Sequence, residues 1–390
     1  SGITTVDNNI EITTSLGGSL DLEQSLNAGT RDITLNSGYE INQTGGTITA
    51  DSLSFTAEEF VSLAQAGNTW NMITGTTTAG AINIADSGTN TTIQNLQTVG
   101  DNITYNHTGA GDVTVTGTVS SGDGVTNGGH IEINSSNALT IASTATLSSQ
   151  TGVGGGDFTV GAATLQAGST IDVGAGDITL NGGALILDTI INTTITGAAA
   201  ILITALRDVI ISSSVTGPDA TSMTITADSN LDGDGGVWLK TGADINSDAN
   251  LTITGSKISD IGANGESVRI DAGATVDAVG NIIIQKSSVA PNTADIVVNG
   301  VVTTTGTGTT ITVDSARDLT TSVDGTANLV GDNIDLTAVN DIDVEIDADS
   351  LFLETTTGDI SVEDVLGGFS LEGFNNPGSG TLTLTTHSPM

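Results

Sequence analysis

The sequence predicts an all-β fold: a single elongated right-handed parallel β-helix of roughly 13–18 coils. Three observations lead to this prediction. A motif of one turn residue followed by apolar, polar and apolar residues recurs, and its tetrapeptide Asp-Ile-Thr-Leu occurs identically at 32–35 and 177–180. Breaks containing Gly, Asn and Asp separate short strand-like segments every ~7–15 residues. The inward positions carry the same aliphatic residue types throughout, as stacked ladders require.

Each copy of the motif is typical of one short strand whose first and third side chains after the turn point inward. Such a strand cannot bury its apolar face alone, so the copies are expected to stack. The leading Asp is interpreted as a turn residue rather than a catalytic acid. Further copies are DVTV at 112–115, DFTV at 157–160, DVII at 208–211, DIVV at 295–298, DIDV at 341–344 and DISV at 359–362.

Taken in chain order, the same pattern predicts strands along the whole sequence. Their expected centres are 32–35, 46–49, 81–84, 112–118, 130–133, 139–142, 157–165, 169–173, 177–180, 184–187, 193–196, 200–204, 208–215, 222–226, 236–240, 251–254, 267–270, 281–285, 295–303, 309–313, 333–337, 341–348, 351–354, 359–362 and 380–385.

One segment also carries a helix signal. Residues 56–59 (Thr-Ala-Glu-Glu) fit a capping box, and Phe60, Leu63 and Ala64 make an apolar face. We favour strands here because both flanks are strands.

The domain organisation predicted is one continuous rod over 1–390, with less regular ends at 1–30 and 366–390. Composition does not shift along the chain. Apolar residues make up 37% but aromatic residues only 3%, which indicates a narrow core of aliphatic side chains.

The net charge of −38 comes from a lack of bases: Asp and Glu number 45, whereas Lys and Arg number 7. Nucleic acid is not expected as a partner, because phosphate binding needs clustered Lys and Arg. Membrane insertion is not expected either, since the longest apolar run, 197–206, is too short to span a bilayer. The absence of Cys excludes disulfides, thiolate metal sites and Cys nucleophiles. No signal peptide is visible after Ser1.

Three stretches, 45–73, 128–162 and 168–188, resemble filamentous-haemagglutinin-type repeats of large bacterial exoproteins and adhesins. The likeness runs over most of 30–365. It implies a right-handed parallel β-helix, export to the cell surface, and a role in adhesion or surface structure. The Asn-Pro motifs that the secretion domains of this family carry near the N-terminus are absent there, and Asn376-Pro377 lies near the other end.

Two acidic stretches are candidate calcium sites. The segment 228–235 matches the first half of a calcium loop, with ligands Asp228, Asn230, Asp232 and Asp234 but Leu239 where a bidentate Glu is required. The alternative is a tight turn rich in Asx residues, which we favour.

In the second stretch, acidic residues alternate with apolar ones, which predicts that all the carboxylates share one strand face. They could bind calcium or simply form a solvated outer face, and we favour the solvated face. The residues are Asp341, Asp343, Glu345, Asp347 and Asp349.

Catalysis is not predicted, although polysaccharide lyases and hydrolases also use parallel β-helices. The basic residues are scattered singly, and His107, His130 and His387 have no partner motif nearby in the sequence. Ice binding is not expected, because the Thr-x-Thr patterns at 114–116, 310–312 and 381–385 do not recur at one coil position.

Trp70 and Trp238 are expected to be buried rather than exposed for stacking on sugars. Seven N-x-S/T sequons matter only if the source organism glycosylates surface proteins; they lie at Asn42, Asn90, Asn102, Asn106, Asn134, Asn192 and Asn250.

Together these features predict a non-enzymatic, secreted, extracellular structural or adhesive protein, part of an adhesin, surface layer or filament. The expected partners are copies of itself and glycan or cell-surface ligands. No cofactor is required, and calcium is the one cation considered. The alternatives are a polysaccharide-active enzyme and, less favoured, an ice-binding protein.

Overall fold

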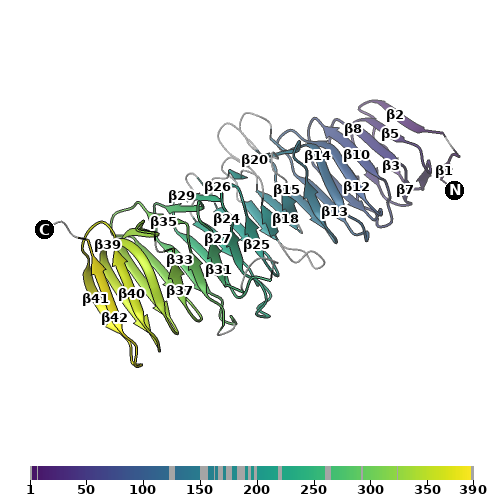
Figure 1. Cartoon of the computed structure of the whole chain (residues 1–390). Helices are drawn as coiled ribbons and strands as arrows, with labels where there is room; N and C mark the ends of the chain where they lie inside the picture. Colours follow the sequence, from purple (N-terminus) through teal and green to yellow (C-terminus); the bar gives the residue numbers. More distant parts are fainter. Residues whose placement is uncertain are drawn as a thin grey trace. The chain divides into compact units, whose positions relative to one another are not determined.

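The computed structural model describes residues 2–6, 8–122, 128–149, 157–161, 163–165, 170–172, 178–181, 189–191, 195–196, 200–217, 222–259, 265–290, 293–322 and 324–387. The chain divides into two compact units, each described by itself. Unit 1 comprises Ser1–Ile186 and Asn192–Ala198, and unit 2 comprises Leu187–Ile191 and Ala199–Met390. Every regular element in the described residues is a β-strand (Figure 1).

Unit 1 is built from columns of parallel strands, which we name faces A, B and C. Face A contains β2 (Ile10–Leu16), β5 (Ile33–Gly38), β8 (Ser52–Ala57), β10 (Met72–Thr77), β12 (Thr91–Gln97) and β14 (Val113–Ser120). After β14 the column divides in two, because β14 pairs with both β16 and β17. One branch contains β16 (Leu139–Ile141) and β19 (Ala163–Leu165), and the other contains β17 (Thr146–Ser148), β20 (Thr170–Asp172) and β23 (Ile195–Thr196). Face B contains β3 (Leu20–Leu22), β6 (Ile41–Gln43), β9 (Val61–Leu63), β11 (Ile82–Asp86), β13 (Ile103–His107), β15 (Ile131–Ser135), β18 (Phe158–Gly161) and β21 (Ile178–Asn181). Face C contains β1 (Ile3–Thr4), β4 (Leu26–Asn27) and β7 (Ile48–Thr49).

Unit 2 has the same construction, with faces D, E and F. Face D contains β22 (Thr189–Ile191), β25 (Val209–Ile211), β28 (Val237–Leu239), β31 (Val268–Ile270), β34 (Ile296–Val298), β37 (Leu319–Thr321), the start of β39 (Ile342–Thr355), β40 (Ile360–Asp364) and β42 (Leu382–Thr386). Face E contains β26 (Ser214–Gly217), β29 (Asp244–Ser247), β32 (Thr275–Ala278), β35 (Val301–Thr304) and the start of β38 (Leu329–Ala338). Face F contains β24 (Ala200–Thr204), β27 (Ser222–Thr226), β30 (Leu251–Gly255), β33 (Ile282–Lys286), β36 (Thr310–Asp314), the ends of β38 and β39, and β41 (Ser370–Asn375).

The strands form because apolar and polar residues alternate, so that one set of side chains is buried and the other faces outward. The buried side chains stack in ladders from coil to coil. In unit 1, Ile33, Leu53, Ile73 and Ile93 are consecutive partners, and all are fully buried. Each such aliphatic side chain contributes about 1.5–3 kcal/mol by burial.

Coil length varies more than the sequence breaks suggest. Partners in adjacent coils lie 20 residues apart at Thr34 and Ser54, but 31 residues apart at Asp244 and Thr275. The extra residues lie in the loops between faces, so the ladder register continues across them.

The predicted parallel β-helix is confirmed. Eight strands stack along face A through β16 and β19, and nine stack along face D, in keeping with the expected roughly 13–18 coils. The preference for strands over a helix near residue 60 is also confirmed, since β8 ends at Ala57 and β9 spans Val61–Leu63. One continuous rod with less regular ends stays a prediction. Of the two Asp-Ile-Thr-Leu copies, Asp177 lies outside the described residues.

Candidate functional site

The aspartates that open the repeated motif bind backbone amides of the next coil. In unit 2, Oδ1 of Asp295 accepts the N–H of Asp318 at 3.1 Å, and Oδ1 of Asp318 accepts that of Asp341 at 3.2 Å. Asp341 and Asp359 continue the ladder to the amides of Asp359 and Thr381, at 2.7 and 2.6 Å. These side chains hold adjacent turns together; the sequence predicted the turn position of the leading Asp but not these bonds between coils.

Asp228, the first candidate calcium ligand, is fully buried, and its carboxylate is surrounded by hydrogen-bond donors. Oδ1 accepts the N–H groups of Asp232 at 2.8 Å and Gly233 at 3.2 Å. Oδ2 accepts the hydroxyl of Ser256 and, at 3.4 Å, that of Ser287. The residue has a φ of 54°, which a turn rich in Asx residues tolerates. Donors aimed at a carboxylate suit a structural turn better than a cation site.

The remaining residues of this loop bond to one another at the surface. Asn230 donates to Oδ2 of Asp232 at 2.8 Å, and Ser259 donates to Asp234. The backbone amide of Asp234, followed by the Asn230 side chain, lowers the pKa of the exposed Asp232 carboxyl. Within the described ranges, no group of three or more His, Cys, Asp or Glu side chains could hold a metal ion. Calcium binding at this loop therefore stays a prediction.

Glu345, the deepest acid of the second stretch, is only 2% exposed. Its carboxylate accepts the N–H groups of Asp324, Gly325 and Thr326 at 3.2, 3.0 and 3.1 Å. The loop at 324–326 covers it, so Glu345 holds a turn instead of lying on a solvated face.

The other acids of this stretch alternate with buried Ile342, Val344, Ile346 and Ala348, so they share the outward side of the strand as predicted, but they do not share one face of the coil. β39 is one strand of 14 residues that crosses from face D to face F. Asp341 and Asp343 are exposed near its start, whereas Asp347 and Asp349 line a cavity of about 230 Å³ together with Asp332. Period-two alternation persists along the acidic stretch, while the strand changes its pairing partner and passes from one coil face to another.

A buried polar network in unit 1 has no signature in the sequence. Oδ2 of Asp86 accepts the hydroxyls of Thr91 at 2.5 Å and Tyr105 at 2.8 Å, and lies 2.9 Å from Nδ1 of His107. Oδ1 accepts the N–H of Gly88 at 2.8 Å. The His107 and Asp86 side chains are both 0% exposed. Burial, and then the Asp86 charge, raises the pKa of Tyr105 well above its ordinary value, so its hydroxyl stays a donor.

All three histidines lie beside acids of a neighbouring coil, although none has a partner motif nearby in the sequence. Besides the buried pair, Nδ1 of His130 lies 3.9 Å from Asp157, and Nε2 of His387 lies 2.7 Å from Glu363. Distance along the sequence hid these pairs, because one coil separates the partners.

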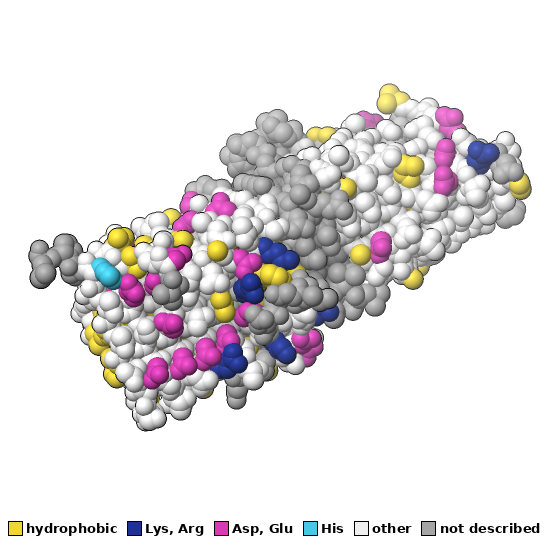
Figure 2. All heavy atoms as spheres, in the orientation of Figure 1, with side chains coloured by type: hydrophobic (Ala, Val, Ile, Leu, Met, Phe, Trp, Pro, Cys, Tyr) yellow, Lys and Arg dark blue, Asp and Glu magenta, His cyan; other side chains and the backbone are white. Residues whose placement is uncertain are grey.

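Both tryptophans are buried as predicted, Trp70 at 1% exposed and Trp238 at 8%. Lys240 Nζ lies 4.2 Å from the Trp238 ring centroid, and the Arg269 guanidinium carbon lies 5.1 Å from it. Two of the bases expected to be isolated therefore meet at one ring. Figure 2 shows most basic side chains of the visible face in one part of it and one set apart from them, among more widely spread acidic side chains.

Thr, Ser and Asn side chains do recur at one coil position, on face A. Thr34, Ser54 and Thr74 are consecutive partners, and so are Asn36, Thr56 and Thr76. In the sequence, the corresponding signal is a three-residue pattern, with side chains pointing outward, inward and outward. The pattern recurs 20 residues later in the next coil. The three Thr-x-Thr patterns noted in the sequence lie on β14, β36 and β42, and therefore on faces A, F and D, so they do not recur at one coil position. The expectation that the protein does not bind ice stays a prediction.

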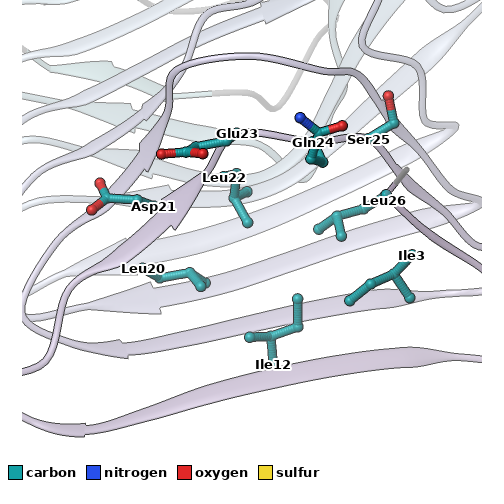
Figure 3. A pocket seen from close by; sticks show the side chains of 10 residues that line it. Ile3, Ile12, Leu20, Asp21, Leu22, Glu23, Gln24, Ser25 and Leu26 are labelled. Atoms are coloured by element: carbon teal, nitrogen blue, oxygen red, sulfur yellow. The ribbon is translucent and has the colours of Figure 1, made fainter.

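The first coil of unit 1 holds an apolar cavity of about 310 Å³. Figure 3 shows its apolar side chains converging from four strands, while Asp21 and Glu23 point away. Within the described residues, β1, β2 and β3 pair with β4, β5 and β6. The apolar lining residues are Ile3, Ile12, Leu20, Leu22 and Leu26. This apolar cavity is the candidate interaction site.

No family model matches the chain, and neither a curated protein nor a solved structure matches it. The resemblance to filamentous-haemagglutinin-type repeats therefore stays a prediction from the sequence. Across the residues that the structure describes, no helix is long and apolar enough to cross a membrane.

Proposed function

We propose that this protein is a non-enzymatic, extracellular structural or adhesive surface protein whose β-helix presents a polar outer surface and associates with other copies. The proposal rests on one observation: the side chains that could act in acid–base chemistry are buried or hydrogen-bonded within the fold. Asp86 and His107 are sealed in the core, Asp228 and Glu345 are engaged by donors from turns, and the motif aspartates bond to adjacent coils.

The three described cavities support the same conclusion. They lie at the first coil, at Asp332 with Asp347, and beside Trp70, and no Lys, Arg or His side chain lines any of them. Polysaccharide lyases need a base, and anionic substrates need a cationic partner. Export to the cell surface rests on the sequence resemblance alone.

A screen for glycan binding and glycan cleavage tests this proposal. The purified chain is incubated with neutral and acidic polysaccharides, and bound protein and newly formed reducing ends are both measured. We expect binding or no interaction, without catalytic release. Sustained release of reducing ends would overturn the proposal.

A second candidate, a glycoside hydrolase, is favoured by one observation: Asp332, Asp347 and Asp349 converge on one cavity. Glycosidases use two carboxylates that flank the scissile bond. The cavity lacks an aromatic platform for a sugar ring. If cleavage occurs in the screen and is lost in Asp349→Asn but not in Asp21→Asn, the hydrolase assignment replaces ours.

A further inference from the structure

We propose that the acidic cavity of unit 2 binds a short aliphatic diamine, whose two ammonium groups pair with the carboxylates of Asp332, Asp347 and Asp349. The cavity measures about 230 Å³, and its other lining residues are small or aliphatic: Thr304, Val330, Gly331 and Ala348. Binding of this kind does not depend on the structural or adhesive role proposed above.

The cavity lies at the corner between faces E and F, where strands of three successive coils meet. Thr304 is the last residue of β35, 330–332 belong to β38, and 347–349 belong to β39. In the described residues, β39 pairs with β40 as far as Ile346 and with β41 from Ser350 onward. No strand of the following coil therefore covers 347–349, and this gap opens the cavity between coils that continue on both sides of it.

Unlike the acids described above, two of these three carboxylates have no donor within the described residues. Oδ2 of Asp332 accepts the N–H of Gly308 at 2.5 Å, but no described group donates a hydrogen bond to the carboxylate of Asp347 or Asp349. No Lys, Arg or His side chain lines the cavity. Like charges gathered at one site repel one another, and a cation bound between them would remove that repulsion.

The negative charge of this corner also acts on the next coil. Burial is the main cause that raises the pKa of Asp364 on β40; the backbone amides of Gly367 and Leu366 oppose the rise, and the charge of Asp347 adds to it. A cation bound at Asp347 would therefore relieve a repulsion that the described residues leave in place.

A buried hydroxyl at the cavity also lacks a partner. Thr304 is 7% exposed, and its Oγ1 forms no hydrogen bond in the part of the chain that the structure describes. Oγ1 faces Gly331, since a Cβ on that residue would lie 2.4 Å from it. The space beside the hydroxyl is open because residue 331 has no side chain. Buried polar groups are normally hydrogen-bonded, and an ammonium group in this space would supply the missing donor.

The spacing of the carboxylates favours an extended organic cation over a metal ion. No group of three His, Cys, Asp or Glu side chains in the described residues could hold a metal ion, so the three acids do not converge on one point. Two ammonium groups joined by methylenes can bind carboxylates at separate points, with the methylenes against Val330 and Ala348. The cavity is smaller than the about 300–1,000 Å³ typical of drug-sized ligands, which suits a short chain.

Isothermal titration calorimetry of the full chain with putrescine (1,4-diaminobutane) tests the proposal. Asp349→Asn removes one carboxylate of the cavity, and Thr304→Val removes the buried hydroxyl while keeping the side-chain shape. Asp343→Asn is the matched control, because it removes an exposed carboxylate of the same strand that does not line the cavity. Circular dichroism and thermal unfolding verify that each variant stays folded.

We expect putrescine to bind the unmodified chain and Asp343→Asn with similar Kd, more weakly as NaCl is raised. Asp349→Asn should raise the Kd about threefold to tenfold, because a charge-assisted hydrogen bond at a partly exposed site is lost. Thr304→Val should raise the Kd by about twofold or more. It should not lower the Tm, since the hydroxyl that it removes has no partner among the described residues.

Absence of binding at millimolar putrescine and low salt would overturn the proposal. A Kd that stays unchanged in either cavity variant would overturn it as well. An equal loss of binding in Asp343→Asn would show general attraction to an acidic chain and lead to the same conclusion.

Two competing ligands separate the diamine from other occupants of the cavity. Calcium chloride that displaces putrescine from the unmodified chain, but binds Asp349→Asn poorly, would show a metal site. The neutral disaccharide cellobiose behaving in the same way would favour the glycoside hydrolase. Either result would overturn the diamine assignment, whereas failure of both ligands to compete would support it.

Discussion

The two units use the same coil but compensate their buried carboxylates differently. Unit 1 sets Asp86 against the side chains of Thr91 from face A and of Tyr105 and His107 from face B. Unit 2 surrounds Asp228 and Glu345 largely with backbone amides of tight loops. The difference shows that a β-helix can bury charge either between side chains of adjacent coils or beneath a turn, and neither arrangement leaves an acid available to substrate.

The largest expected effect on stability comes from removing the acceptor of the buried Asp86 network in unit 1. Asp86→Ala leaves His107, Tyr105 and Thr91 without their shared acceptor in the core, and should destabilise unit 1 by about 3–5 kcal/mol. Urea unfolding, with hydrogen exchange of residues 82–107 to localise the change, measures it.

Two comparisons keep this prediction falsifiable. His107→Gln should cost less than Asp86→Ala, because the other donors to Asp86 stay in place. Asp21→Ala, at an exposed position of β3, should change stability by less than about 0.5 kcal/mol. Equal stability of Asp86→Ala and the unmodified chain would show that the buried network contributes nothing.

The next effect concerns the turn-based arrangement in unit 2. Asp228→Ala removes a charged acceptor from two amides and a serine hydroxyl, at a cost of about 1.5–3 kcal/mol. The loss should be the same with millimolar calcium or with EDTA, as read by thermal unfolding. If calcium raises the Tm of the unmodified chain but not that of Asp228→Ala, the result would support calcium binding at Asp228.

A smaller effect comes from the packing of unit 1. A Cβ on Gly75 would lie 2.0 Å from Cζ of Phe55, so Gly75→Ala should cost about 1–3 kcal/mol. Combining it with Phe55→Leu should cost less than the sum of the two single changes. Strict additivity in this double-mutant cycle would contradict direct contact between the two residues.

The smallest effect is a pH dependence in unit 2. Burial raises the pKa of Asp364, while the backbone amides of Gly367 and Leu366 oppose the rise. Its contribution to stability is fully present below the ordinary Asp value of about 3.9, and is lost as pH rises through the raised pKa. Asp364→Asn should therefore stabilise unit 2 at pH 7 and have little effect at pH 3. Urea unfolding at both pH values measures the effect, and a stabilisation by Asp364→Asn that is larger at pH 3 than at pH 7 would contradict the prediction.

The fold could be predicted because its information is local. Each strand carries its own alternation and its own turn residue, so the copies of the motif were sufficient to predict stacking. The turn role of the leading Asp was predictable for the same reason.

The partners of the buried acids could not be predicted, because they come from other coils of variable length. Asp86 meets His107 after 21 residues, whereas Asp228 meets Ser256 after 28 and Ser287 after 59. Local spacing suggested a calcium loop at Asp228 because the two serine hydroxyls that also bind its carboxylate come from later coils, beyond any local pattern. The bend of β39 was likewise invisible in a strictly alternating sequence.

Measurement of newly formed reducing ends, during incubation of the purified chain with neutral and acidic polysaccharides, tests the central claim that the fold engages its buried acids within the structure. We predict no sustained release of reducing ends by the unmodified chain. Sustained release that is lost in Asp349→Asn would contradict the account.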